Sequence, residues 1–329
     1  MRRVIISGGG TGGHIYPAIT IARAIADIEP TEFLYVGSKI GLENTLIPKE
    51  GLPFVTLDVR GLERKISVRN LVTLGKTAGS LIKAEGIIRK FKPDVVIGTG
   101  GFVCGPVLLA ASLSGVPTLI QEQNVIPGVT NTILSRFVNR VALGYEEAAA
   151  RFKRKDVLVY TGNPVRKDIL TVTREEGRKA LGLDPDKFTL LVAGGSRGAR
   201  SINTAMIEVH KYFRNDEHIQ ILHVTGDHEY DRVVKQLPGI ECRGRYGKGS
   251  RIIPYLHHMP EALAACDLAV YRAGAVGLAE LTVRGVPSIR QDADWPGIVG
   301  RNHSFKRRSE GAGSDGTGQP LHGQAPGGT

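Results

Sequence analysis

The sequence has few of the residues that hold structural metals or disulfides. Only three cysteines occur among 329 residues, and their spacing matches no zinc motif. A sparse, odd set predicts free thiols in a reducing compartment. Two Asp-x-Asp pairs occur, at 184–186 and 292–294. The first has the composition of a turn and the second lies in an atypical tail, so we expect no metal site.

Long apolar runs are also absent. No stretch reaches the roughly 20 apolar residues that span a bilayer, and the first residues do not form a signal peptide. Aromatic residues are scarce, at 6%, and they do not alternate with basic residues in a stripe typical of nucleic-acid binding. Lys and Arg number 43 against 32 Asp and Glu, a formal net charge of +11. This excess favours nucleotides, phosphates or an acidic lipid surface, and we expect no nucleic-acid partner.

The sequence does contain a regular alternation of short apolar runs and helix-period segments. This alternation predicts an α/β protein with parallel sheets and right-handed crossovers. The length favours two domains, and residues 162–166 have the composition of a linker. The expected strands lie near 4–7, 33–36, 52–59, 95–97, 117–120, 141–143, 157–160, 188–192, 219–224, 252–256 and 268–270.

A glycine-rich loop at 8–13 separates the first strand from the first helix. Gly8, Gly10 and Gly13 match the dinucleotide pattern G-x-G-x-x-G, but the second strand ends in Gly37 and Ser38 rather than in an acidic residue for the ribose. No Lys-Ser/Thr pair follows, which excludes a P-loop. The helix start nevertheless suits an anion. His14, at the loop mouth, either caps the helix or acts as a base, because imidazole titrates near neutral pH.

Two more loops follow strands of the first half, at 98–101 and 122–124. Because ligands bind at the carboxyl ends of parallel strands, we expect both loops to converge on 8–14. The second half repeats the strand, glycine loop and helix order at 188–199 and again at 268–280. The sequence therefore predicts two similar halves, each presenting helix N–H groups to a ligand.

Six segments, taken in order, resemble motifs of the MurG family of bacterial glycosyltransferases: 8–14, 98–101, 122–124, 162–166, 194–196 and 272–275. The resemblance extends from residue 1 to about 289. It implies the GT-B fold, with two Rossmann-like domains whose parallel sheets face a cleft. It assigns 1–162 to an acceptor and membrane side, 163–289 to an incomplete UDP-sugar-binding domain, and 290–329 to a tail.

The resemblance also implies a reaction. The family transfers N-acetylglucosamine from UDP-N-acetylglucosamine to the 4-hydroxyl of undecaprenyl-pyrophosphoryl-muramyl-pentapeptide, inverts the anomeric centre, and needs no metal or cofactor. His14 and Glu122 compete as general base, and Glu122 could instead orient His14 or its loop. Gly100 and Gly101 would face the acceptor diphosphate. The residues expected to bind the donor are Thr11, Gly12, Gly13, Asn124, Arg166, Ser196, Leu256, Ala275, Val276 and Glu280.

The predicted helix 68–90 and the basic segment 60–65 before it could lie on an anionic bilayer. A core helix with solvated lysines fits the same pattern. Together with a lipid-linked acceptor, the resemblance favours peripheral binding at the cytoplasmic face of the bacterial cell membrane.

The chain departs from the family in two places. Arg197 stands where a glutamine is expected, and after Ile289 the sequence becomes rich in glycine and poor in large aliphatic residues. We expect a disordered tail, produced by a frameshift or truncation, and a poor or inactive catalyst. The alternatives are a non-catalytic fragment that binds nucleotide or membrane, and a UDP-N-acetylglucosamine epimerase of the same fold. An NAD-dependent oxidoreductase is opposed by Gly37 and Ser38.

Overall fold

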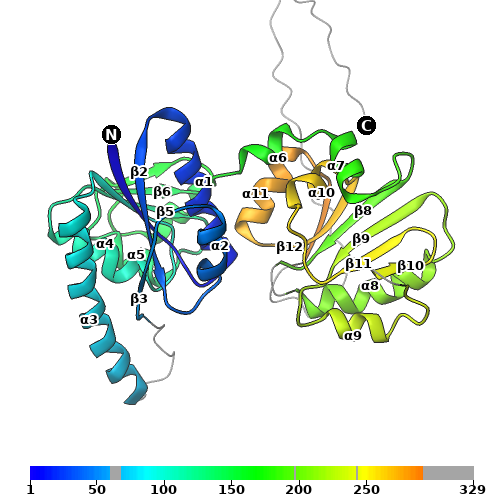
Figure 1. Cartoon of the computed structure of the whole chain (residues 1–329), viewed down its shortest axis with the longest axis horizontal. Coiled ribbons are helices and arrows are strands. Elements are labelled where there is room, and N and C mark those ends of the chain that lie inside the picture. Colours follow the sequence, from blue (N-terminus) through cyan, green and yellow to red (C-terminus); the bar gives the residue numbers. More distant parts are fainter. Residues whose placement is uncertain (60–67, 196–197, 242–243, 292–329) are drawn as a thin grey trace, which may run out of the picture. The chain divides into compact units, whose positions relative to one another are not determined.

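The protein is described here from a computed structural model that covers residues 1–59, 68–195, 198–241 and 244–291, with the backbone alone for 68–78. The described residues form two sheets with helices on both faces of each (Figure 1). The first sheet has the strand order β3-β2-β1-β4-β5-β6-β7, and the second has the order β10-β11-β9-β8-β12-β13.

The first sheet is parallel throughout. Its strand order reverses between β1 and β4, which makes the carboxyl ends of these two strands the place where a ligand is expected. The strands are β1 (Arg2–Ser7), β2 (Thr31–Ser38), β3 (Phe54–Leu57), β4 (Val95–Gly98), β5 (Thr118–Glu122), β6 (Arg140–Leu143) and β7 (Leu158–Tyr160).

Alternate residues of these strands enter two different cores, because successive side chains of a strand point to opposite faces. Ile5 and Val96 pack with α3, α4 and α5, whereas Val4, Ile6 and Ile97 pack with α1 and α2. Burial on both faces explains the continuous apolar runs of these strands. The helices are α1 (Gly12–Ile28), α2 (Glu43–Lys49), α3 (Val68–Phe91), α4 (Cys104–Leu113), α5 (Val129–Leu134) and the 3₁₀ helix η1 (Glu146–Arg151).

The second sheet reverses its strand order between β8 and β12, so it has a switch point of the same kind. Its pairings are parallel except for the short edge strand β10, which is antiparallel to β11. The strands are β8 (Phe188–Ala193), β9 (Ile219–Val224), β10 (Arg245–Tyr246), β11 (Ser250–Ile253), β12 (Leu268–Arg272) and β13 (Ser288–Gln291). The helices are α6 (Lys167–Thr171), α7 (Arg174–Leu181), α8 (Arg200–Tyr212), α9 (Tyr230–Lys235), α10 (Met259–Ala265) and α11 (Ala275–Arg284).

The predicted alternation of strands and helices is confirmed. The strand expected at 52–59 is shorter, and the antiparallel strand β10 and the short helices α5, α6 and α9 were not predicted. Cys104 and Cys266 are buried and free, and burial raises the pKa of the Cys104 thiol to about 11. The domain boundaries at 162 and 289 stay a prediction. The expectations for Cys242 and for the tail beyond 291 fall outside the described residues.

Candidate active site

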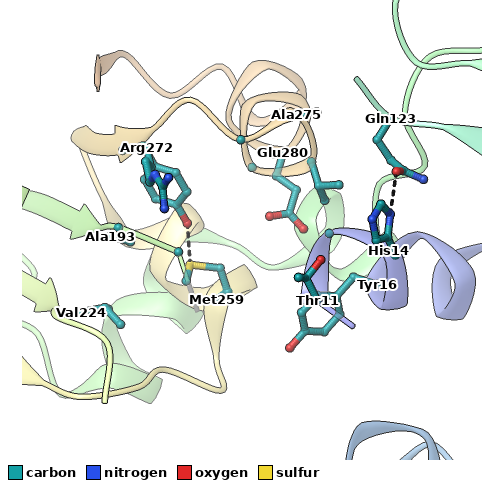
Figure 2. Close-up of a pocket in the computed structure, with 18 of the residues that line it drawn as sticks. Thr11, His14, Tyr16, Gln123, Ala193, Val224, Met259, Arg272, Ala275 and Glu280 are labelled. Atoms are coloured by element: carbon teal, nitrogen blue, oxygen red, sulfur yellow. Dashed lines mark hydrogen bonds between the residues drawn. The ribbon is translucent and has the colours of Figure 1, made fainter. Parts of the chain in front are cut away.

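A pocket of about 560 Å³ is lined by residues from both switch points (Figure 2). The first half contributes the loop after β1 and the start of α1, and the second contributes the loops after β8 and β12 and the start of α11. The residues predicted from the sequence that line it are Thr11, Gly12, Gly13, His14, Asn124, Arg166, Leu256, Ala275, Val276 and Glu280. Ser196 and Arg197 lie outside the described residues.

His14 lies at the mouth of the first glycine loop, where three loops of the first half meet. Its Nδ1 lies 3.0 Å from the carbonyl oxygen of Thr99 and 3.1 Å from Oε1 of Gln123. Figure 2 shows the imidazole beside the Gln123 side chain. The predicted convergence of segments 8–14, 98–101 and 122–124 is therefore confirmed. No described residue forms a hydrogen bond with Nε2 of His14, which remains available to a substrate.

Glu122 is buried beneath the pocket rather than on its wall. Its Oε1 accepts hydrogen bonds from the backbone N and side-chain Nδ2 of Asn124, at 3.0 and 3.1 Å. Its Oε2 accepts from the backbone N of Gly128 at 3.0 Å and from Nδ2 of Asn131 at 2.8 Å. With 1% of its surface exposed and four donors on its oxygens, this carboxylate shapes the loop that carries Asn124. It makes no hydrogen bond to His14 in the described structure.

A second buried carboxylate, that of Glu43, fixes the first glycine loop by accepting a hydrogen bond from its backbone. The backbone N of Gly10 donates to Oε2 of Glu43 at 3.0 Å, and Oε1 of Glu43 accepts from the backbone N and the hydroxyl of Ser38. Glu43 is fully buried. The amide that would approach a pyrophosphate in a dinucleotide site is thus occupied by an acidic residue, which opposes the NAD interpretation of the loop.

Gly100 and Gly101 do not line the pocket, although they pack against residues that do. Both have positive φ, +111° and +87°. A Cβ at Gly100 would lie 2.6 Å from Nδ1 of His14, and one at Gly101 would lie 2.5 Å from the carbonyl oxygen of Gly9. These glycines let the loops approach closely enough to support the His14 ring.

Glu280 and Arg166 form a largely buried ion pair on the opposite wall. Nη2 and Nε of Arg166 lie 3.0 and 3.3 Å from Oε1 of Glu280, and Oε2 of Glu280 has no hydrogen bond within the described residues. Burial raises the pKa of Glu280, and the guanidinium of Arg166 acts against this shift. The guanidinium also stacks on the ring of Tyr16, 5.1 Å from its centroid, and the Tyr16 hydroxyl lies 3.2 Å from that of Tyr255.

Helix α11 begins at the pocket wall. Its N-cap is Gly274, no side chain caps it, and no acidic residue lies in its first turn. Ala275, Val276 and Gly277 line the pocket, so the free N–H groups of the first turn stand beside it. An uncapped ten-residue helix offers these donors and a partial positive charge to an anion.

No group of three or more possible metal ligands was found among the described residues. The Asp184–Asp186 pair forms a turn, in which the backbone N of Asp186 donates to Oδ1 of Asp184 at 2.9 Å. Within the same described part of the chain, no helix is long and apolar enough to cross a membrane.

Two family models match the two halves of the chain. Residues 4–143 match the N-terminal domain of glycosyltransferase family 28, and residues 189–290 match its C-terminal domain. The chain belongs to glycosyltransferase family 28. The solved MurG structure of Acinetobacter baumannii is similar to this chain, with a TM-score of 0.64 and 25% identity over 89% of this chain and 79% of that one. Together with the family models, this similarity confirms the predicted resemblance and the GT-B architecture.

Curated family 28 relatives extend this result. A protein of Thermoanaerobacter sp. is 48% identical over 92% of this chain and 81% of its own length, and one from Desulforamulus reducens is 50% identical over 87% and 77%. Both are named UDP-N-acetylglucosamine–N-acetylmuramyl-(pentapeptide) pyrophosphoryl-undecaprenol N-acetylglucosamine transferase. A putative UDP-N-acetylglucosamine 2-epimerase of Listeria monocytogenes shares the fold, with 15% identity and a TM-score of 0.64 over 88% of this chain and 78% of its own.

Several pocket residues of this family 28 protein were not predicted as site residues. Tyr16 follows His14 by two positions, and Tyr255 precedes the predicted Leu256, so nearness in sequence was the only available signal. Arg272 is the last residue of strand β12 and Gly194 directly follows β8, so both lie at strand carboxyl ends, where ligands are expected. Gln123 lies within the 122–124 loop, but nothing near it in the sequence predicts its contact with His14.

Proposed function

We propose that this protein transfers N-acetylglucosamine from UDP-N-acetylglucosamine to the 4-hydroxyl of undecaprenyl-pyrophosphoryl-muramyl-pentapeptide, with inversion at the anomeric carbon. The observation that carries the proposal is the near-half identity, over most of both chains, to relatives named for this transfer. The pocket supports it, because a base and an anion-binding helix start lie on walls built by opposite halves.

The second half would bind the donor. Oε2 of Glu280 is free to accept hydrogen bonds from ribose hydroxyls, while Arg166 holds Oε1 and fixes the carboxylate. The start of α11 would receive the diphosphate, whose negative charge grows as it leaves. Arg272, on the same wall, adds a positive charge near that position.

The first half would activate the acceptor. The acceptor oxygen attacks the anomeric carbon opposite the leaving UDP, the carbon–oxygen bond to UDP breaks, and its electrons go to the diphosphate. Nε2 of His14 takes the hydroxyl proton as the new bond forms. We assign the base to His14 rather than to Glu122, because Glu122 lies off the pocket wall and its oxygens already accept four hydrogen bonds.

We place the membrane-facing surface of the same half at α5, beside the acceptor side of the pocket. Val129 and Ile133 are 77% and 52% exposed, and their spacing of four puts them on one side of this helix. Ile126, in the loop before the helix, is 67% exposed. Exposed arginines follow at 136 and 140. An exposed apolar strip beside basic residues suits an anionic bilayer and peripheral binding at the cytoplasmic face.

The sequence pattern favours a different membrane surface, formed by the helix 68–90 and the basic segment 60–65 before it. Segment 60–67 and the side chains of 68–78 lie outside the described residues, so that expectation stays a prediction. Farther along α3, Ile82 is 71% exposed, whereas Ala84 and Ile88 belong to the core. The described end of the helix therefore has both an exposed apolar residue, as a membrane-facing helix would, and residues of the core.

Turnover with and without acceptor tests the proposed reaction. UDP release from UDP-N-acetylglucosamine should require the lipid-linked muramyl-pentapeptide, and a disaccharide-linked lipid should form. An epimerase would convert the donor alone, and a non-catalytic fragment would bind UDP-N-acetylglucosamine without turnover. Either of these two outcomes would refute the proposed reaction.

Cosedimentation with vesicles tests the membrane surface. Val129→Asp should reduce binding to anionic vesicles, whereas Tyr212→Asp, at an exposed aromatic residue of the second half, should not. Equal binding by wild-type protein and Val129→Asp would exclude this surface.

A further inference from the structure

The hydrogen-bond partners of His14 determine which of its nitrogens carries a proton. Nδ1 lies 3.0 Å from the backbone carbonyl oxygen of Thr99. A carbonyl oxygen only accepts hydrogen bonds, so Nδ1 is the donor and carries the hydrogen. In the neutral imidazole, Nε2 is then unprotonated, which is the form that a base acting from Nε2 requires.

The amide orientation of Gln123 is determined by its own partners. Its Nε2 lies 2.7 Å from the carbonyl oxygen of Thr99 and 3.0 Å from that of Gln121. Because both oxygens are acceptors, the amide nitrogen must face them, and Oε1 must face His14. Gln123 therefore presents a second acceptor to Nδ1, at 3.1 Å.

Two further amides continue this network in the same direction. Gln123 Nε2 donates to Oε1 of Gln121, and Gln121 Nε2 donates to Oδ1 of Asn163 at 3.1 Å. Nδ2 of Asn163 in turn donates to the backbone carbonyl oxygen of Gln123 at 3.1 Å. We call Gln123, Gln121 and Asn163 the amide relay. Since both ends of the relay meet backbone carbonyls, flipping any one amide would bring like groups together.

We propose that Gln123 is a positioning residue that, supported by the amide relay, holds His14 with Nδ1 protonated and the lone pair of Nε2 directed to the acceptor hydroxyl. The catalytic part of this inference rests on the proposed function. The structural part, a fixed tautomer, does not. Gln123 is 2% exposed, so water does not replace its oxygen in this role.

The His14 ring makes its described hydrogen bonds to neutral groups only. The titratable side chains that line the pocket together with His14 are Tyr16, Arg166, Tyr255, His257, Arg272 and Glu280. Behind the loops lie Glu43, Cys104 and Glu122. None of these groups forms a hydrogen bond to the ring within the described residues, so a carboxylate at position 123 would be the first beside Nδ1.

Two substitutions should therefore shift the pH dependence of the transfer in opposite directions. Gln123→Met removes the acceptor, which stabilises the imidazolium less, so the acidic limb of kcat/KM should move down by about half a pH unit. Gln123→Glu places a negative charge beside Nδ1 and should move that limb up by about one unit. We expect Gln123→Met to lower kcat about fivefold, the size of one neutral hydrogen bond, with an unchanged Kd for UDP-N-acetylglucosamine.

Gln220→Met is the matched control. Gln220 is a buried amide of the second sheet that bonds to Asp184 and Thr189, and its loss should leave the acidic limb in place. If the acidic limb of the kcat/KM profile moved in the same direction for both Gln123 variants, the role of Gln123 would be merely structural and the proposal would be overturned.

A spectroscopic measurement on the full chain separates this inference from the proposed reaction. In ¹⁵N-histidine-labelled protein, with the His14 signals assigned by their loss in His14→Gln, the wild type should show the Nδ1–H tautomer above the acidic limb. Gln123→Met should gain a measurable share of Nε2–H, and Gln123→Glu should keep Nδ1–H. An Nε2–H tautomer in the wild type, or identical tautomers in wild type and Gln123→Met, would refute the role of Gln123 even if transfer occurs.

Discussion

Two histidines buried in the second sheet should make that half of the protein sensitive to acid. Nε2 of His210 lies 3.0 Å from Nδ1 of His223, and both side chains are fully buried between α8 and β9. Nε2 of His223 lies 3.0 Å from Oδ1 of Asn203, whose Nδ2 donates to the carbonyl oxygen of Thr225. His223 therefore carries its proton on Nε2 and accepts from His210 on Nδ1.

A further proton is disfavoured in this buried pair. At Nδ1 of His223 it would face the N–H of His210. At Nδ1 of His210 it would meet the hydroxyl of Ser250, 3.0 Å away, but burial still opposes charge on either ring. Burial lowers the pKa of His210 from 6.5 to about 4, and burial together with the charge of His210 lowers that of His223 from 6.5 to about 3. In the unfolded chain both rings take up protons once the pH falls below about 6.5.

The free energy of unfolding should therefore fall with decreasing pH. The unfolded state binds more protons between about pH 6.5 and the lower folded-state values, so stability is present above this window and lost within it. Each pH unit costs about 1.4 kcal/mol for each histidine, which gives about 2 kcal/mol each, and about 4 kcal/mol together, on going to pH 5.

Urea titrations at pH 7.5 and pH 5 would measure this loss. Pulse hydrogen exchange on peptides from α8 and β9 reports the second half alone, which avoids mixing the transitions of two halves. His223→Gln should remove about half of the pH-dependent loss, whereas the exposed His218→Gln should leave it unchanged. Equal stability of the wild type at the two pH values, or an unchanged loss in the His210→Gln/His223→Gln double variant, would refute the reasoning.

Three more predictions concern the pocket. In steady-state transfer assays, His14→Ala should lower kcat by about 10²–10⁴-fold, while calorimetry should find a donor Kd within about twofold of the wild-type value. An unchanged kcat would remove His14 from the mechanism. Gly100→Ala should displace the His14 ring and lower kcat at least about tenfold, whereas Gly105→Ala, whose added Cβ would meet only Thr130 at 3.8 Å, should be neutral; equal kcat values would contradict the packing argument. Calorimetry should find UDP-N-acetylglucosamine bound more tightly than NAD, and Glu280→Ala should weaken that donor about tenfold; tighter NAD binding would overturn the donor assignment.

The parts of the fold and site that local sequence encodes were predicted. Strand β9 occupies the expected residues 219–224. The rule that ligands meet strand carboxyl ends correctly joined His14, Thr99 and the 122–124 loop. Both glycine loops of the second half were also placed at strand ends, and they line the pocket where they are described.

The remaining features depend on contacts between distant residues or on segments too short to show a period. Nothing near Glu43 in the sequence indicates that it binds Gly10, 33 positions earlier, and nothing near Gln123 indicates its bond to His14. Helix α5 has six residues, too few for its exposed apolar side to stand out as a pattern. The expected tail and the reduced activity of the chain stay predictions, because the residues that decide them lie beyond 291.

The bond between Gly10 and Glu43 has a consequence for protein engineering. Adding an aspartate at the end of β2 would complete the dinucleotide-binding sequence pattern. At Gly37 the new side chain would meet Glu43 and Phe54, since even a Cβ there lies 2.8 Å from atoms of both. At Ser38 it would remove the hydroxyl that Glu43 accepts from and bring two carboxylates together. A redesign toward NAD would therefore have to replace the buried Glu43 before adding the ribose-binding residue. Glu43 already accepts a hydrogen bond from the Gly10 amide, which the pyrophosphate of the cofactor would need.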